Sequence, residues 1–396
     1  MCGRVPAKCR DVRFPSKAES EGWQGAGGVA CVVAAGGGDV AVPGPAEQSD
    51  GQMRHHGWVP EPGVRARDLL AGPRGRELCA RLAGIDVWEV RKGIVPLTVA
   101  DLLGRLSQQR SVPGFEDDGP LAAVAALADT AEEANYWGGW SAGPLEDPAV
   151  IAELRTMATR VAESAGCQWW WSCVDRSAQQ DVQWTGHEEP APGLGNAAEM
   201  LRRIDAEVIE RERRMSRDRH RPAGTGIAGP WWSFPFPGLI STTRRLGSLG
   251  AVLLAGREDG HGDTEAVVRP LVLAGNARVF EIDQPQAWQR LVTGYPRTAT
   301  ATYRHTWAWT GWDGEWLIPH WPAVAADWDG VHLSVAGYLS IAGRALPAGS
   351  ARTLLAGWNP DETYWLTDVI TSLGEAQAWH NASREPFGWK MRTMTS

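Results

Sequence analysis

The sequence predicts an α+β protein in which a mainly helical domain precedes a strand-rich α+β domain. Between residues 60 and 166 the apolar residues recur three or four positions apart, as they do on one face of a helix. From residue 231 onward, short apolar or alternating runs are separated by turn residues, as in β-strands. A Gly- and Pro-rich stretch, residues 220–230, lies between the two patterns.

The length and composition are typical of a folded protein with two domains. The chain has 396 residues, of which 43% are hydrophobic and 22% are charged. Residues 1–56 show little periodicity, which predicts a disordered leader or residues ahead of the true start. We expect a mainly helical domain with a short strand pair over residues 57–219, a linker over 220–230, and the strand-rich domain over 231–396.

Capping residues mark the helix starts in the first domain. Thr98, with Asp101 three residues later, predicts a capped start. Asp147-Pro148 predicts an N-cap followed by proline at the first helical position, where its missing N–H costs nothing. Asn196 begins a further predicted helix that carries charges of both signs, which indicates an exposed face.

Strands are predicted mostly in the second half, with helices beginning near Asp283 and at Pro322 among them. Val331, Leu333 and Val335 alternate with polar residues, which is typical of a half-buried strand. A turn is expected at residues 359–361. The predicted strands are residues 168–172, 181–185, 239–244, 251–255, 267–273, 278–282, 300–309, 331–335 and 352–356.

Several classes of protein are disfavoured by charge, hydropathy and cysteine spacing. The net charge of −8 argues against nucleic-acid binding. No apolar run reaches membrane-spanning length, and the N-terminus lacks the pattern of a signal peptide. The six cysteines form no CxxC pair and have no histidine at zinc-ligand spacing, so no metal site is expected. We therefore expect a cytoplasmic protein with reduced thiols.

The motifs of P-loop nucleotide-binding proteins and of HExxH metalloproteases are absent. Asp329, His332 and Ser334 suggest a catalytic triad, but His332 and Ser334 lie two residues apart on a predicted strand. Their Cβ atoms would be about 7 Å apart, too far for a Ser–His hydrogen bond.

The segment that follows the linker holds the candidate ligand-binding residues. Trp232 precedes a predicted strand in which Ser241 and Thr243 share one face, while Thr242 and Arg244 share the other. Hydroxyl groups beside an arginine suit a ligand that carries phosphate or ribose. An edge strand with polar outer positions is the alternative interpretation, since threonine favours strands in any case.

Glu281 is the candidate catalytic residue. It interrupts an apolar strand between Phe280 and Ile282, and a carboxylate there needs either solvent or a partner. If a nucleotide pocket exists, we expect Glu281 to line one concavity with Trp232, Ser241, Thr242 and Arg244.

The 22 tryptophans allow two interpretations. They could fill the core, since each buries a large apolar area. They could instead form a stacking surface for a sugar, a nucleobase or a nicotinamide ring. A non-enzymatic module that presents residues such as Trp307 and Trp328 to a protein or a glycan is therefore the alternative to an enzyme.

Residues 230–366 resemble a Trp-rich family common in actinobacterial genomes, whose function is uncharacterised. The resemblance covers Trp231-Trp232-Ser233, residues 241–244, 279–288 (VFEIDQPQAW), 329–339 (DGVHLSVAGYL) and 357–366 (GWNPDETYWL), with a weaker match at 168–184.

Ser241 and Thr242 on a strand after an aromatic-Ser segment are also similar to the serine-motif strand of mono-ADP-ribosyltransferases. The resemblance implies NAD as the bound nucleotide, with a glutamate that positions the ribose and the acceptor. Glu281 and Glu362 are the candidates for this glutamate by their location in the sequence.

Overall fold

The computed structural model describes residues 60–85, 87, 98–108, 119–132, 143–186, 193–217, 232–235, 238–258, 262–383 and 388–392. The predicted leader (residues 1–56) and the predicted linker (220–230) lie outside these ranges. Residues 56–396 belong to one compact unit, so all the described elements are parts of it.

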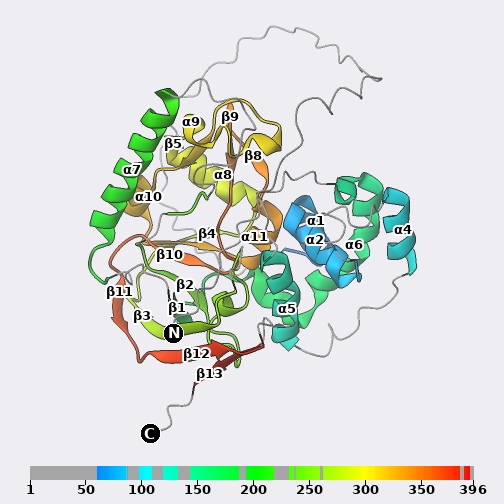
Figure 1. Ribbon diagram of the computed structural model, residues 1–396, viewed down its shortest axis with the longest axis horizontal. Helices are drawn as coiled ribbons and strands as arrows, with labels where there is room; N and C mark the ends of the chain where they lie inside the picture. Colours follow the sequence, from blue (N-terminus) through cyan, green and yellow to red (C-terminus); the bar gives the residue numbers. More distant parts are fainter. Residues whose placement is uncertain are drawn as a thin grey trace, which may run out of the picture. The chain divides into compact units, whose positions relative to one another are not determined.

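Helices dominate the first half of the described chain and strands the second half, which confirms the predicted mixed α+β class. Figure 1 shows the helices before residue 165 in blue to cyan and most of the strands in green to red. The α-helices are α1 (Pro62–Ala71), α2 (Pro73–Leu82), α4 (Val99–Gln108), α5 (Gly119–Glu132), α6 (Pro148–Glu163), α7 (Ala197–Arg217), α8 (Pro285–Gly294), α9 (Thr300–Tyr303), α10 (Trp321–Asp327) and α11 (Val335–Ile341).

A large mixed sheet forms the centre of the structure. Its strand order is β13-β12-β3-β1-β2-β10-β7-β4, and β11 pairs with β3 beside this path. All neighbours are antiparallel except β4 and β7, which are parallel. The strands are β1 (Gln179–Trp184), β2 (Ser241–Arg244), β3 (Glu265–Leu273), β4 (Val279–Ile282), β7 (Gly330–Leu333), β10 (Thr363–Trp365), β11 (Ile370–Leu373), β12 (Gln377–Asn381) and β13 (Trp389–Met391).

Two small two-stranded sheets complete the described strands. Strand β5 (Pro296–Thr298) pairs with β6 (Leu317–Pro319), and β8 (Ala345–Ala348) pairs with β9 (Ala351–Leu354), both antiparallel. The largest apolar core cluster joins residues of both halves of the chain, including Trp170, Trp288 and Tyr338. The early helices and the sheet therefore share a core.

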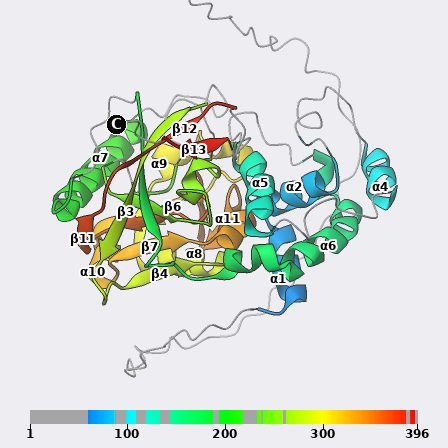
Figure 2. The same ribbon diagram turned by 90° about the horizontal axis from the view of Figure 1, so that it is seen from below.

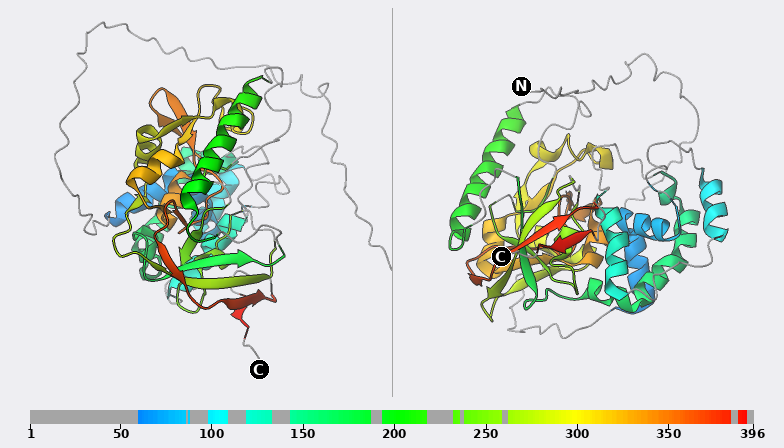
Figure 3. Two further views of the ribbon diagram at one scale, coloured as in Figure 1. Left: turned by 90° about the vertical axis from the view of Figure 1, so that its left-hand side faces the viewer. Right: turned by 60° about the horizontal axis from the view of Figure 1, so that its bottom comes forward.

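The helices around the sheet pack on different neighbouring elements. Helices α1 and α2 pack on α11, which follows β7 directly, and Figure 2 shows α11 between the sheet and these helices. Helix α7 packs on α9 and α10 instead, and Figure 3 shows it on the outside of the sheet region, in green. Its last two turns carry few buried side chains, in agreement with the exposed face predicted from its charges.

The predicted helix caps are present. The hydroxyl of Thr98 accepts from the backbone N–H of Asp101 at 3.2 Å, and the Asp101 carboxylate accepts from the backbone N–H of Thr98 at 2.9 Å. These are the two reciprocal bonds of a capping box. Asp147 caps α6 through the backbone N–H of Ala149 at 2.8 Å.

The strand predicted at residues 168–172 is wrong, because this segment belongs to a 3₁₀ helix, η3 (Ala165–Trp171). Trp170 is fully buried, whereas Trp169 and Trp171 are less so. Trp169 meets the Trp170 ring edge-on, at an interplanar angle of 87°. Three consecutive rings pack in different directions here, and a strand would place the first and third on one face.

The strand predicted at residues 251–255 is also wrong. The segment contains a 3₁₀ turn, η4 (Val252–Leu254), in which the backbone N–H of Leu253 donates to the Thr243 hydroxyl at 3.0 Å. Its residues are all buried. A short run of this kind has no periodicity that distinguishes strand from helix.

The strand predicted at residues 300–309 is wrong, because the segment begins with helix α9, whose first turn is capped by a residue distant in the sequence. Glu212 on α7 accepts hydrogen bonds from the backbone N–H groups of Ala301 and Thr302, both at 2.8 Å, and from the Thr302 hydroxyl at 2.7 Å. These bonds satisfy the first N–H groups of α9, which a helix leaves without internal partners. The carboxylate lies about 90 positions away in the chain, so local sequence could not reveal it.

The strand predicted at residues 331–335 ends two residues early. β7 stops at Leu333, and the Ser334 hydroxyl accepts from the backbone N–H of Gly337 at 3.0 Å. Ser334 thus caps α11, a helix that the alternating pattern concealed.

Candidate functional site

Two parallel strands with the same sequence pattern place a glutamate beside a histidine. In β4 (VFEI) and β7 (GVHL) the ionisable residue is third, and the register pairs Glu281 with His332. The His332 Nδ1 lies 2.5 Å from the Glu281 Oε2. The second oxygen, Oε1, accepts from the backbone N–H of Val174 at 3.0 Å. Both oxygens of the Glu281 carboxylate are therefore held.

Asp361 links this pair to an arginine on β2. The Asp361 Oδ1 lies 3.4 Å from the His332 Nε2 and accepts from the Arg244 Nε at 2.6 Å. Its Oδ2 accepts from the backbone N–H of Arg244 at 2.9 Å. Glu281, His332, Asp361 and Arg244 thus form a continuous series of alternating charges, hereafter the charge chain.

The charge chain is buried except at one end. The side chains of His332, Asp361 and Arg244 are 0%, 1% and 7% exposed, whereas that of Glu281 is 23% exposed. The Arg244 guanidinium also donates to the Ser172 hydroxyl at 2.8 Å and lies 5.1 Å from the Trp169 ring centroid. Burial of these charges is tolerated because each has an opposite partner and hydrogen bonds.

The environment keeps His332 protonated at neutral pH. Burial alone would lower its pKa, but the charge of Glu281 and the hydrogen bond with Asp361 outweigh burial and raise the pKa to about 9. Burial would raise the pKa of Asp361, but the hydrogen bond with His332 and the charge of Arg244 bring it below its ordinary value. An imidazolium between two carboxylates is the result.

A thiol lies beside the exposed end of the charge chain. Burial, and then the charges of Glu281 and Asp283, raise the pKa of Cys173. Its backbone carbonyl accepts from Arg244 at 3.3 Å. A raised pKa leaves little thiolate at neutral pH, so Cys173 is a poor nucleophile in this arrangement.

The same face of the sheet continues as a polar row towards β3. Register places His332, Thr363, Thr242, Asp181 and Arg269 on successive strands. The Thr242 hydroxyl donates to the Gln179 amide oxygen at 2.6 Å and accepts from the Trp365 indole N–H at 2.9 Å. Burial raises the pKa of Asp181 to about 6, against the opposing charge of Arg269. Thr242 is fully buried, so its role here is to join strands.

The opposite face of β2 holds a separate buried group. Ser241 pairs with Tyr364, and its hydroxyl hydrogen-bonds to both Glu362 and Tyr364. Burial raises the pKa of Glu362, although the backbone N–H and side-chain amide of Asn359 donate to it at 3.1 and 3.0 Å.

Trp232 belongs to this opposite group as well. Its ring stacks on Phe234 at a centroid distance of 6.0 Å, and Phe234 stacks on Tyr364 at 5.5 Å. The predicted site residues are therefore divided by the sheet. Glu281, Thr242 and Arg244 share one face. On the other face Ser241 contacts Tyr364, and Trp232 is linked to Tyr364 through Phe234.

Sequence reasoning missed two members of the charge chain, His332 and Asp361. The repeated pattern of β4 and β7 was the available signal for His332, because a parallel pair in register brings the third residues together. Asp361 lies in the predicted turn after β9, and it is the only non-glycine residue with positive φ (63°) among the described residues. Such backbone strain persists where surrounding contacts hold it.

The rejected triad does not form. Ser334 caps α11, and Asp329 accepts from Arg278 at 2.8 Å. His332 is instead engaged at both ring nitrogens by Glu281 and Asp361.

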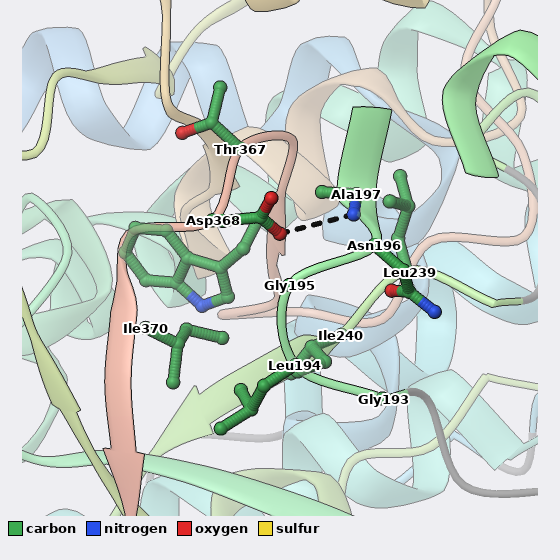
Figure 4. A pocket seen from close by; sticks show the side chains of 11 residues that line it. Gly193, Leu194, Gly195, Asn196, Ala197, Leu239, Ile240, Thr367, Asp368 and Ile370 are labelled. Carbon is green, nitrogen blue, oxygen red and sulfur yellow. Dashed lines mark hydrogen bonds between the residues drawn. The ribbon is translucent and has the colours of Figure 1, made fainter. Parts of the chain in front are cut away.

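One small pocket lies away from the charge chain, at the start of α7 (Figure 4). Leu194, Ile240 and Ile370 contribute apolar walls, and Asp368 accepts from the backbone N–H of Ala197 at 3.1 Å. Its volume is about 20 Å³, enough for roughly one water molecule and far below that of a nucleotide pocket.

Comparison with family models, with curated proteins and with solved structures finds no match. The resemblances to a Trp-rich actinobacterial family and to mono-ADP-ribosyltransferases thus stay predictions. Within the described ranges, no group of three or more histidine, cysteine or acidic side chains is placed to hold a metal ion. None of the helices described there has the length and apolar character needed to span a membrane.

Proposed function

We propose that the chain is an enzyme whose working group is the Glu281 carboxylate, and that its reaction is ADP-ribosyl transfer from NAD. The observation that supports this most is the exposure of Glu281, 23%, at the end of a charge chain that is otherwise buried. Both Glu281 oxygens are held, so the carboxylate has a fixed direction.

A fixed carboxylate suits a reaction that builds positive charge. Cleavage of the bond between ribose and nicotinamide develops positive charge on the ribose, and a preorganised negative group stabilises that charge. The buried partners keep Glu281 in place, so little reorganisation is needed when the charge develops.

The proposal depends on Glu281 and not on the Ser-Thr strand. Thr242 is fully buried, and the Arg244 guanidinium is engaged with Asp361. Ser241 contacts Tyr364 on the other face of β2, and Trp232 is linked to Tyr364 through Phe234. The cofactor-binding roles predicted for these four residues, of which the transferase resemblance concerned Ser241 and Thr242, stay predictions with less support.

The alternative, a non-enzymatic module that presents tryptophans to a protein or glycan, also has less support. Trp307, Trp316 and Trp321 are buried, and Trp309, Trp312 and Trp328 are half-buried. The large hydrophobic side chains exposed among the described residues are Leu194, Val272 and Met391. None of them is a tryptophan.

The decisive experiment is nicotinamide release from NAD by the full chain, followed by chromatography and mass spectrometry. Glu281→Gln keeps the shape of the side chain but removes its charge, so we expect turnover to fall by at least about 100-fold while thermal unfolding shows an intact fold. Asp283→Asn, which neutralises a neighbouring exposed carboxylate, should retain turnover.

Thermal-shift screening against NAD, other nucleotides and sugars completes the test. A shift with NAD supports the proposal. If the unmodified chain neither binds nor consumes NAD, the transferase proposal fails, and the interaction module becomes the better account.

A further inference from the structure

The partly exposed Glu281 carboxylate of the candidate site is held in place by a neighbour, His332, whose side chain is fully buried. His332 contacts Glu281 Oε2 at 2.5 Å, and its side chain is 0% exposed. Its second nitrogen is held by Asp361, which is held in turn by two hydrogen bonds from Arg244. Any displacement of His332 would therefore release one of the two anchors of Glu281.

We infer that His332 is a positioning residue for Glu281, and that Asp361 and Arg244 keep it charged and in place. This inference rests on the proposed function, because it assigns Glu281 as the group that meets the substrate. His332 does not itself reach the substrate, since its ring is buried and both nitrogens are occupied.

A purely structural role is the competing explanation, because a buried ionic network can simply join strands. Two observations favour positioning. The charge chain ends near the surface, at the partly exposed carboxylate of Glu281, and not at a further buried partner. Asp361 also adopts a φ of 63°, a conformation that a non-glycine residue rarely takes.

A second arginine–aspartate pair shows that strand joining needs no such strain. Asp329 accepts from the backbone N–H of Arg278 at 2.8 Å and from its Nε at 3.2 Å. It makes the same two kinds of contact as Asp361 without a positive φ. Each aspartate has one further partner, the Thr367 hydroxyl for Asp329 and the His332 ring for Asp361. The positive φ thus occurs in the aspartate that contacts His332.

Turnover should depend on pH through the protonation of His332. The groups that face His332 are Glu281 and Asp361, with Arg244 behind Asp361, and with Cys173 and Asp283 near Glu281. Because His332 loses its proton only near pH 9, turnover should fall as the pH rises through that value. Loss of the proton removes the positive charge that anchors Glu281.

Asp361→Asn tests this in the full chain. Asparagine tolerates positive φ and can still accept a hydrogen bond, so the change removes mainly the charge. We expect the alkaline limb of kcat to move down by about one pH unit or more, with KM little changed, because an opposite charge typically shifts a pKa by this amount. Asp329→Asn removes the matched charge of the second pair and should leave the limb in place.

Ring-¹⁵N-histidine NMR gives a readout that does not require activity. The nine histidines are labelled, and the signal of His332 is assigned by its absence in His332→Gln. We expect His332 to titrate near pH 9 in the unmodified chain, and at lower pH in Asp361→Asn and in Glu281→Gln. Glu281 is partly exposed, so this second variant remains informative if Asp361→Asn does not fold.

His332→Gln separates positioning by a hydrogen bond from positioning by charge. Its amide can donate to Glu281 but does not titrate, so measurable turnover with no alkaline limb near pH 9 is expected. A wild-type limb that persists in this variant would overturn the inference.

The remaining outcomes separate the inference from the proposed function. If NAD is consumed and the NMR titration moves in Asp361→Asn, but the kcat profile does not, the charge chain is structural and only the inference fails. A histidine titration that does not respond to Asp361→Asn or Glu281→Gln also overturns it. If the unmodified chain releases no nicotinamide, the proposed function fails and the inference fails with it.

Discussion

Two aspartates in this protein each bind the backbone N–H and the Nε of an arginine, one inside the fold and one near the surface. Asp361 binds Arg244 at 2.9 and 2.6 Å, and Asp329 binds Arg278 at 2.8 and 3.2 Å. The Arg244 side chain is 7% exposed and that of Arg278 is 53% exposed. Similar local geometry thus occurs in two very different dielectric environments.

The difference shows that burial, and not the hydrogen-bonding pattern, determines which further partners such an arginine–aspartate pair requires. Near the surface, water solvates the Arg278 guanidinium, and Asp329, whose side chain is 15% exposed, needs only a further bond from the Thr367 hydroxyl at 3.0 Å. In the interior, every remaining charge must be matched by protein groups. The buried pair accordingly has His332 next to Asp361, and Ser172 and Trp169 next to Arg244.

The largest expected effect is the loss of the buried arginine. Arg244→Met removes the guanidinium and keeps similar side-chain length, which leaves the Asp361 carboxylate with one charged partner, His332. We expect the free energy of unfolding in urea to fall by about 3–5 kcal/mol, the usual result of breaking a buried ion pair. Arg278→Met is the matched control at the surface and should lose far less. Equal losses in the two variants would contradict the distinction between the pairs.

A smaller effect on the free energy of unfolding is expected from pH, and the raised pKa of His332 determines its direction. The pKa is 6.5 for an ordinary histidine and about 9 in the fold. A raised pKa stabilises the folded state fully below pH 6.5, and this contribution is lost as the pH rises through 9. The difference corresponds to at most about 3 kcal/mol.

Urea unfolding of the wild type and of His332→Gln between pH 6 and pH 10 measures this contribution. The wild type should lose its advantage over the variant as the pH rises. Cys79 and Cys167, whose pKa burial raises to about 12, also destabilise the fold at high pH, but equally in both proteins. An advantage that does not change with pH would show that His332 is not charged in the fold.

Local signals in the sequence were sufficient where structure depends on neighbours in the chain. The capping box at Thr98 and the Asp147-Pro148 helix start are present. The alternation of Ser241 with Thr242 along β2 also holds, since their side chains bond to groups on opposite faces of the sheet. These features are decided by one helical turn or by the period of a strand.

Features that depend on distant residues could not be predicted. Helix α9 forms where Glu212 caps it from α7, and the three consecutive tryptophans of η3 follow the packing of their rings. In the candidate site, Glu281 is an unusual residue for its strand, but its partner follows only from the parallel register of β4 with β7. The place of Asp361 in the charge chain depends on that register together with a strained turn.

The smallest expected effect concerns the surface pair and its response to salt. Asp329→Asn should lower stability only slightly, because the Arg278 side chain stays solvated when its partner loses charge. Salt at 1 M shortens the screening length to about 3 Å, so the difference between wild type and Asp329→Asn should shrink further. The loss caused by Arg244→Met should persist at the same salt concentration, because ions do not reach a pair whose side chains are 7% and 1% exposed. Urea unfolding of the three proteins at low and high salt makes this comparison. If salt reduced both losses in proportion, the Arg244–Asp361 pair would be accessible to ions, and burial would not be what separates it from Arg278–Asp329.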